Sequence, residues 1–253
     1  MAQENFYTEV YPDIIEQWKF YLDLLELQTG DKVLDIGCNR GDTEIFMVNN
    51  NPQIEKVVGI DIDQERLNDA KNKLKTNVQE EKIEFQKMDA CNLEFEDGTF
   101  DKIICAETIE WVDKPKKAIE EIKRVLKPNG IGLVQHTDFD SQIFTTNQLN
   151  LTRKIINEFT DSGPDGTIGR KLLGLCKKAN FKEITPLIYT VINENFEKDY
   201  YSYQIAHMMK DWLINGEIIE KEKLSNWLND LKEINEKEDF FYSINRNLII
   251  CKK

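Results

Sequence analysis

The chain has 253 residues, with 46 acidic and 33 basic side chains and a formal net charge of -13 at neutral pH. A length of this order suits one α/β domain with an elaboration, and it can bury a core without disulfides or a structural metal. This negative charge argues against a groove that binds nucleic acid, because phosphate binding requires clustered lysine and arginine. Nucleic acid is therefore not an expected partner.

The beginning of the chain and its cysteines indicate its compartment. No apolar run approaches the roughly 20 residues of a membrane span, and the first five residues lack a basic and apolar signal region. We therefore expect a cytoplasmic protein without a membrane span. The five cysteines are scattered and form no C-x-x-C pair, and His136 and His207 are the two histidines. A metal site is not expected from this spacing.

Residues 33–41, VLDIGCNRG, carry the most informative pattern in the chain. A short apolar run that contains Asp35 passes Gly37, Asn39 and Gly41 and leads into a helix-prone run. This is the sequence form of a strand, a tight turn and a helix start. Glycine adopts positive φ without strain and allows a ligand to approach the backbone, and asparagine is the next most tolerant residue. The pattern predicts a small-molecule site at the carboxyl end of a buried strand.

A nicotinamide dinucleotide is the first alternative ligand for such a turn. Its fingerprint, G-x-G-x-x-G, would need glycine at positions 37, 39 and 42, but the chain has Asn39 and Asp42 at the last two. Asp42 also falls at the helix start that would receive a pyrophosphate, where two negative groups repel each other. A cofactor with a positive centre and no phosphate remains acceptable, and S-adenosylmethionine has this character.

Strands and helices alternate along the first half of the chain. Residues 11–27 have the apolar spacing of an amphipathic helix that precedes the first strand. The helices expected between the strands call for right-handed crossovers and a mostly parallel sheet. The next expected strands cover residues 56–60, 82–88, 100–106 and 131–136.

Acidic residues follow two of these strands. Asp61 ends the second strand one helix and one strand after Asp35, at the position where a doubly wound fold hydrogen-bonds ribose hydroxyls. Asp63 precedes the next helical run and is interpreted as its N-cap. Asp89 follows the third strand, where its carboxylate either accepts the amino group of an adenine or caps its own backbone turn.

The second half of the chain continues the alternation and then departs from it. Helices are expected at residues 149–159 and 168–180, and strands at 184–192 and 240–251. The aromatic and charged residues 196–238 interrupt the closing hairpin of the sheet and are interpreted as a helical cap, with a dimer surface or an inert insertion as the alternative. The predicted division is an N-terminal helical segment at 1–28, a Rossmann-like core at 29–195 and 239–253, and a cap at 196–238.

Five motifs in this order resemble the class I S-adenosylmethionine-dependent methyltransferases, and most closely the group that includes the ubiquinone and menaquinone biosynthesis methyltransferases. Together they are far more specific than one glycine-rich turn. The resemblance implies a Rossmann-like sheet of seven strands with helices on both faces, S-adenosylmethionine as methyl donor and S-adenosylhomocysteine as product. The matching segments are VLDIGCNRG at 33–41, VGID at 58–61, MDA at 88–90, FDKII at 100–104 and RVLKPNG at 124–130.

The resemblance also assigns roles around the cofactor. It implies that Asp61 binds the ribose, that Ile62 covers one adenine face, and that Asp89 with Ala90 meets the adenine edge. Asn39 replaces the middle glycine of the family pattern, and asparagine can hold the same turn. The remaining cofactor residues that it implies are Asp35, Gly37, Cys38, Asn39 and Gly41 at the methionine half, and Ala106 and Glu107 near the sulfonium.

The acceptor side is specified less closely. Trp111 stands where relatives often have histidine, and it provides either an aromatic wall beside the methyl donor or core packing. His136, which ends the expected fifth strand, is the candidate general base, because an imidazole titrates near neutral pH; a buried structural histidine is the competing interpretation. Asp138 is the alternative base. The candidate substrate-binding residues are Tyr11, Trp111, Arg170, Tyr203 and His207.

We expect an enzyme that moves a methyl group from S-adenosylmethionine to oxygen or nitrogen of a small metabolite, with carbon as the less favoured acceptor. In such an in-line displacement the protein must align the reactants and exclude water. The expected assembly is a monomer or a homodimer. Two alternatives stay open at this point, an NAD-dependent oxidoreductase and a non-catalytic S-adenosylmethionine-binding module.

Overall fold

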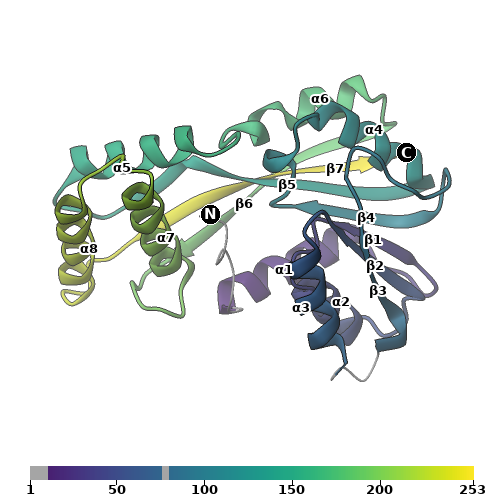
Figure 1. The fold of residues 1–253 in the computed structure, drawn as a ribbon, viewed down its shortest axis with the longest axis horizontal. Helices are drawn as coiled ribbons and strands as arrows, with labels where there is room; N and C mark the ends of the chain where they lie inside the picture. Colours follow the sequence, from purple (N-terminus) through teal and green to yellow (C-terminus); the bar gives the residue numbers. More distant parts are fainter. Residues whose placement is uncertain (1–10, 76–79) are drawn as a thin grey trace. The chain divides into compact units, whose positions relative to one another are not determined.

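The computed structural model describes residues 11–75 and 80–253, and their elements alternate as the sequence predicts (Figure 1). Within these residues seven strands form one sheet in the order β3-β2-β1-β4-β5-β7-β6. The pairs β1 with β2, β1 with β4, β2 with β3 and β4 with β5 are parallel. The predicted Rossmann-like, mostly parallel sheet is therefore confirmed. The first ten residues of the predicted segment 1–28 lie outside the described part.

Helices and strands alternate along most of the chain, except that β4 follows β3 directly and that α5 to α6, and α7 to α8, are successive helices. In chain order they are α1 (Pro12–Leu25), β1 (Lys32–Ile36), α2 (Asp42–Asn50), β2 (Lys56–Asp61), α3 (Gln64–Leu74), η1 (Glu80–Lys82), β3 (Ile83–Lys87), β4 (Phe100–Ala106), η2 (Ile109–Trp111), α4 (Pro115–Val125), β5 (Leu126–Phe144), α5 (Leu149–Ser162), η3 (Ile168–Lys171), α6 (Leu172–Lys178), β6 (Glu183–Asn193), α7 (Tyr201–Asn215), α8 (Lys221–Asn235) and β7 (Tyr242–Lys252).

The chain divides into two compact units. The first unit consists of Trp18–His136, Arg170–Leu187 and Asn247–Lys253. The second unit consists of Thr137–Gly169 and Ile188–Arg246, together with the N-terminal residues as far as Gln17.

The first unit contains the point at which the strand order reverses. From β1 the chain adds β2 and β3 on one side and later β4 and β5 on the other. Because βαβ crossovers are right-handed, α2 and α3 lie on one face of the sheet and α4 on the opposite face. The contacts agree, since α2 and α3 pack against β2 and β3, and α4 packs against α6. Ligands of doubly wound folds bind at the carboxyl ends of the strands beside such a reversal.

Burial follows from this layering. The strands β1 and β2 are buried over almost their whole length, as expected for parallel strands covered on both faces. The helix α3 begins where the sequence predicts, because the Asp63 carboxylate accepts hydrogen bonds from the backbone N–H groups of Glu65 and Arg66, at 2.8 and 3.2 Å. The predicted N-cap role of Asp63 is therefore confirmed.

The second unit is built largely from helices, with α5 packed against α7 and α7 against α8. Trp227 on α8 is fully buried, and its Nε1 donates a hydrogen bond to Thr152 Oγ1 at 2.9 Å. The Asp230 carboxylate accepts hydrogen bonds from Thr146 Oγ1 at 2.7 Å and from the backbone N–H of Asn147 at 2.9 Å. These bonds join α8 to the residues just before α5 and to α5 itself.

The fifth strand is longer than the sequence indicates. We predicted a strand at 131–136, but β5 runs to Phe144. The polar residues between 138 and 142 weaken the strand pattern, while pairing across the sheet compensates: the N–H of Asn245 donates to Ser141 Oγ at 2.9 Å. His136 therefore lies inside the strand and not at its end.

The prediction of one continuous helix at 168–180 is also wrong. The segment is a 3-10 turn over Ile168–Lys171 followed by the shorter helix α6.

Candidate functional site

The carboxyl ends of β1 to β4 bring the predicted cofactor residues to one edge of the sheet, within the first unit. Asp35 lies one residue before the end of β1, and Asp61 is the last residue of β2. Asp89 follows β3 by two residues, and Ala106 ends β4 immediately before Glu107. Since these neighbouring strands are parallel, their ends lie on the same side of the sheet.

The turn after β1 has the left-handed backbone that the sequence indicates. Gly37, Asn39 and Gly41 have φ of 84°, 50° and 77°. The N–H groups of Gly37 and Cys38 donate hydrogen bonds to the carbonyl of Ile60, at 2.8 and 2.9 Å, which holds the turn against β2. A Cβ at Gly37 would lie 1.9 Å from Oγ1 of the Thr108 side chain. Glycine is therefore required there by both backbone conformation and space.

The Asp61 carboxylate is fixed by backbone donors. Its Oδ2 accepts a hydrogen bond from the N–H of Asn39 at 3.0 Å, and its Oδ1 accepts one from the N–H of Asp63 at 2.9 Å. Each carboxylate oxygen has a second lone pair and can also accept a bond from a hydroxyl group. Beside it, the Ile62 side chain is 68% exposed. An oriented acceptor next to an exposed apolar side chain fits a ribose with an attached aromatic ring.

Asp89 caps its own backbone turn, which is one of the two roles that the sequence predicts for it. Its Oδ1 accepts a hydrogen bond from the backbone N–H of Cys91 at 2.8 Å, so the carboxylate caps its own turn. The residue is nevertheless exposed, whereas Ala90 next to it is buried. The turn therefore presents a held carboxylate to solvent, and capping does not exclude recognition of a ligand.

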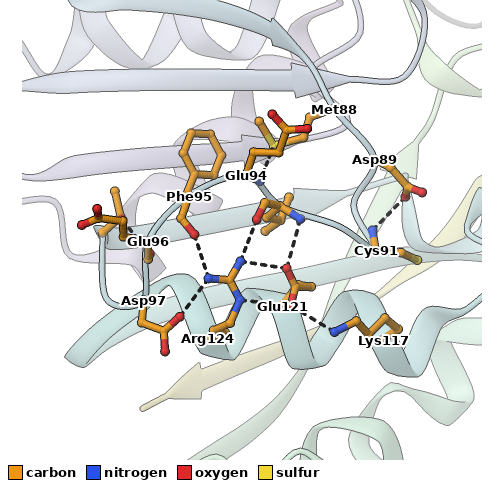
Figure 2. Close-up of polar contacts among 12 residues, drawn as sticks. Met88, Asp89, Cys91, Glu94, Phe95, Glu96, Asp97, Lys117, Glu121 and Arg124 are labelled. Atoms are coloured by element: carbon orange, nitrogen blue, oxygen red, sulfur yellow. Dashed lines mark hydrogen bonds and ion pairs between the residues drawn. The ribbon is translucent and has the colours of Figure 1, made fainter.

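An arginine fastens the loop after Asp89 to helix α4, as Figure 2 shows. Arg124 donates from Nη1 to the Phe95 carbonyl at 2.7 Å and from Nη2 to the Leu93 carbonyl at 2.7 Å. Its Nη2 also donates to Glu121 at 2.8 Å, and Glu121 accepts a bond from the N–H of Leu93 at 3.0 Å. The sequence marks residues 124–130 as a motif, but the role of Arg124 in holding this loop was missed. Two of its acceptors are distant backbone carbonyls, which leave no sequence signal.

Arg124→Met is expected to lower the free energy of unfolding by about 1 to 3 kcal/mol, because the carbonyls of Leu93 and Phe95 lose a donor and Glu121 keeps the Leu93 N–H and Lys117 but loses its arginine partner. The hydrogen bond from Arg124 is the main reason why the pKa of Glu121 is lowered to about 2. This contribution is complete above the unfolded pKa of about 4.3 and is lost as the pH falls toward 2.

Urea unfolding at pH 7 and pH 3.5 measures the effect of Arg124→Met. The difference from the wild type should be smaller at pH 3.5. The matched control is Lys116→Met, because Lys116 forms an exposed ion pair with Glu120 on the same helix, at 3.7 Å. Equal losses in the two variants would contradict the assigned role.

The end of β4 has an unusual backbone. Glu107 has φ of 51°, which is rare for a residue other than glycine, and such conformations concentrate at functional sites. Its carboxylate accepts a hydrogen bond from Gln135 Nε2 at 2.9 Å, and its N–H donates to the Gln135 carbonyl at 3.3 Å. These contacts with β5 hold Glu107 in the conformation that turns the chain away from the sheet.

Acidic groups collect beneath the glycine turn. Burial, and secondarily the charge of Asp61, raise the pKa of Asp35 to about 7. Burial also raises the pKa of Glu44, on α2, well above its usual range. The pKa of the Cys38 thiol is raised by burial and then by Glu44, so this cysteine is not a thiolate nucleophile. Glu44 was missed in the sequence, because a carboxylate is rarely expected on the buried face of a helix.

The acceptor-side residues are divided between the two units. In the first unit, Trp111 is 41% exposed in η2, Arg170 is exposed in η3, and His136 is fully buried in β5. In the second unit, Tyr11 and Asp138 are buried.

The structure brings Tyr203 and His207 together on α7. Their rings stack at 3.9 Å, and His207 Nδ1 hydrogen-bonds the Tyr203 carbonyl at 2.8 Å. Burial lowers the pKa of His207, which favours the neutral ring at pH 7.

The comparison with known families agrees with this geometry. Residues 34–134 match the methyltransferase domain family Methyltransf_11. The demethylmenaquinone methyltransferase of Lactobacillus johnsonii is 29% identical over 118 residues, which cover 46% of this chain and 48% of that protein. The chain spans about half the length of the curated relatives it matches.

Solved structures show the same fold. A putative methyltransferase from Bacillus halodurans has a TM-score of 0.63 and 18% identity, over 94% of this chain and 99% of that one. A second structure is phosphoethanolamine N-methyltransferase 2 of Haemonchus contortus, crystallised with S-adenosyl-L-methionine. It has a TM-score of 0.61 and 18% identity, over 94% of this chain and 52% of that one. The chain therefore has the fold of these solved methyltransferases. Residues 34–134 are similar to a methyltransferase domain, and the predicted resemblance to the ubiquinone and menaquinone group is confirmed.

The described residues provide neither a membrane-spanning helix nor a cluster of metal ligands. None of their helices combines the length and apolar character needed to cross a membrane. They also contain no group of three or more histidine, cysteine, aspartate and glutamate side chains that could hold a metal ion.

Proposed function

We propose that the protein is an S-adenosylmethionine-dependent methyltransferase that methylates oxygen or nitrogen of a small molecule. The observation that carries the proposal is the fixed carboxylate of Asp61 beside the exposed Ile62, within a methyltransferase domain. The nicotinamide alternative is not favoured, because Asp42 occupies the helix start and forms an ion pair with Lys73 at 2.7 Å.

The residues at the sheet edge suit each part of the cofactor. Asp61 would accept bonds from the ribose hydroxyls, Ile62 would cover one adenine face, and Asp89 with Ala90 would meet the adenine edge. When bound, S-adenosylmethionine supplies an electrophilic methyl group on a sulfonium centre. The residues proposed for its other end are Asp35, Gly37, Cys38, Asn39 and Gly41 at the methionine half, and Ala106 and Glu107 near the sulfonium.

The chain's own tasks in this reaction are to orient the acceptor, exclude water and remove one proton from an oxygen or nitrogen nucleophile. His136 and Asp138 are the proposed bases, and both are buried. A buried imidazole is shielded from bulk water, which suits proton transfer within a closed site. The residues proposed to orient the acceptor are Tyr11, Trp111, Arg170, Tyr203 and His207.

The remaining parts of the proposal concern the whole molecule. We propose that residues 196–238, which contain α7 and α8, act as a cap inserted between β6 and β7 of the core at 29–195 and 239–253. We also propose a cytoplasmic protein, monomeric or homodimeric, whose partner is its small-molecule acceptor.

The test of the proposed function uses S-adenosylmethionine with a 13C-labelled methyl group. The protein is incubated with sets of phenols, carboxylic acids, amines and activated aromatic rings, and S-adenosylhomocysteine formation is measured. The 13C chemical shift of the product distinguishes methyl on oxygen, nitrogen and carbon. Methyl on oxygen or nitrogen is expected. Transfer only to ring carbon would contradict the proposed acceptor atom, and binding of S-adenosylmethionine without any turnover would favour a non-catalytic module.

A further inference from the structure

Glu44 is a buried acid without an evident counter-group. It lies on α2 with its side chain fully buried, and neither carboxylate oxygen meets a hydrogen-bond donor among the described residues. Space for it comes from Gly59 on β2, where a Cβ would lie 2.3 Å from Glu44 Oε1. An ionised carboxylate in such a place is strongly destabilising unless it is paired, so the charge of Glu44 must be neutralised in some way.

The groups that face Glu44 are acids. Asp35 on β1 is the nearest titratable partner, and Asp42 lies on the same helix. Asp61 on β2 acts on Asp35, and the Cys38 thiol of the turn is influenced by both Asp35 and Glu44. From β3, the apolar ring of Phe85 packs at Gly59, next to Glu44. Lys73 on α3 pairs with Asp42, and the buried groups named around Glu44 are two further carboxyl groups and a thiol, so the site must hold fewer negative charges than carboxyl groups.

A proton between the two nearest carboxyl groups resolves this arrangement. Two carboxylates repel each other, whereas a carboxylic acid donates a strong hydrogen bond to a neighbouring carboxylate. Gly59, beside which Glu44 Oε1 lies, is paired in register with Asp35 across β1 and β2, so the two carboxyl groups lie side by side. Burial raises the pKa of both groups. Because Glu44 is fully buried and Asp35 is 5% exposed, a negative charge costs more on Glu44, so the proton belongs to Glu44 and Asp35 is the acceptor.

We propose that Glu44 is a positioning residue that stays protonated and donates a hydrogen bond to Asp35, so that Asp35 alone gives up a proton when a cationic ligand binds at the turn. The proposal rests on the proposed function, because the methionine half of S-adenosylmethionine carries an ammonium group. The proton of Asp35 goes to solvent, and Glu44 keeps its own. Binding is then linked to pH through Asp35.

Calorimetry with S-adenosylhomocysteine, which has the ammonium group but no sulfonium, tests this linkage. Titrations at pH 6 and 8.5 in buffers of different ionisation enthalpy count the protons released. About one proton should be released at pH 6 and almost none at pH 8.5, and Kd should tighten about tenfold between them. The sign follows from Asp35, whose pKa near 7 leaves it protonated at pH 6 in the free protein. Binding without proton release at pH 6 would overturn the proposal.

Two variants separate the donor from mere packing. Glu44→Gln keeps a donor toward Asp35, so Kd should stay within about twofold of the wild type with the same pH profile. Glu44→Leu removes the donor, and Kd at pH 7 should weaken about tenfold, with the pH midpoint shifted upward. Glu55→Gln is the control, because Glu55 is an exposed partner of Lys32. If the two Glu44 variants share one Kd and one pH profile and differ only in stability, the role is structural and the proposal fails.

A measurement without ligand keeps this proposal distinct from the proposed function. In a 13C NMR titration of the carboxyl carbons, Asp35 should titrate near pH 7, and Glu44 should still be protonated when Asp35 has lost its proton. An ionised Glu44 at pH 7 would overturn the proposal whether or not a ligand binds. Absence of S-adenosylhomocysteine binding at every pH would instead contradict the proposed function and the linkage that rests on it.

Discussion

Gly37→Ala is expected to abolish detectable S-adenosylhomocysteine binding and to lower the free energy of unfolding by about 2 to 4 kcal/mol. The new Cβ would lie 1.9 Å from Thr108 Oγ1, and the backbone has φ of 84°. Relief requires either Thr108 or the turn to move, and the turn carries the N–H groups that bond to Ile60. Urea unfolding and calorimetry measure the two losses separately.

Two further variants divide this effect into its causes. Gly30→Ala has the same backbone demand, with φ of 85°, but nothing lies within 4 Å of its Cβ, so it should cost only about 1 kcal/mol and leave binding intact. The double variant Gly37→Ala/Thr108→Ala removes the two closest contacts, those with Thr108 Oγ1 at 1.9 Å and Cγ2 at 2.6 Å, and keeps the one with Cβ at 2.8 Å, so it should recover part of both the stability and the affinity. If Gly37→Ala behaves like Gly30→Ala, the close approach of Thr108 to this turn is not what requires glycine.

Asp61→Ala is expected to weaken S-adenosylhomocysteine binding by about 2 to 4 kcal/mol, or about 30-fold to 1000-fold in Kd. It removes the proposed acceptor for the ribose hydroxyls. It also removes the bonds that hold the N–H groups of Asn39 and Asp63. Asp61→Asn retains one acceptor oxygen and should give a smaller loss.

His136→Ala is the comparison for Asp61→Ala. His136 is fully buried, so this variant should lose stability. The proposed role of His136 concerns the acceptor, and its effect on the cofactor Kd should therefore be within a few-fold when measured at a temperature where the variant is folded. Equal loss of cofactor affinity in the two variants would contradict the division of the site into a cofactor side and an acceptor side.

The parts of the site that the sequence predicts well are those that local chemistry determines. The turn after β1 needs residues that tolerate positive φ, and Gly37, Asn39 and Gly41 are recognisable as such. Asp63 was identified as an N-cap because capping depends on the next three residues alone. The strands and helices of the first half are predictable for the same reason, because each can be recognised from the periodicity of its own apolar residues.

What the sequence could not show depends on distant partners. Arg124 looks like an ordinary surface residue of a helix until the loop containing Leu93 and Phe95 is folded onto it. Glu44 looks like part of a polar helix face, and its burial depends on the space left by Gly59 on another element. The extension of β5 past His136 is stabilised by bonds to residues about a hundred positions away, such as Asn245. Tertiary contacts override local preference in all three cases.

The most direct test of the central claim is thermal unfolding with S-adenosylmethionine, S-adenosylhomocysteine and NAD, each added separately. A ligand that binds only the folded state stabilises it by about 2.7 kcal/mol at a hundredfold excess over Kd, which raises the midpoint measurably. Both sulfur compounds should raise the midpoint, and NAD should leave it unchanged. A midpoint that responds to NAD but to neither sulfur compound would contradict the assignment of the glycine turn to an adenosyl cofactor.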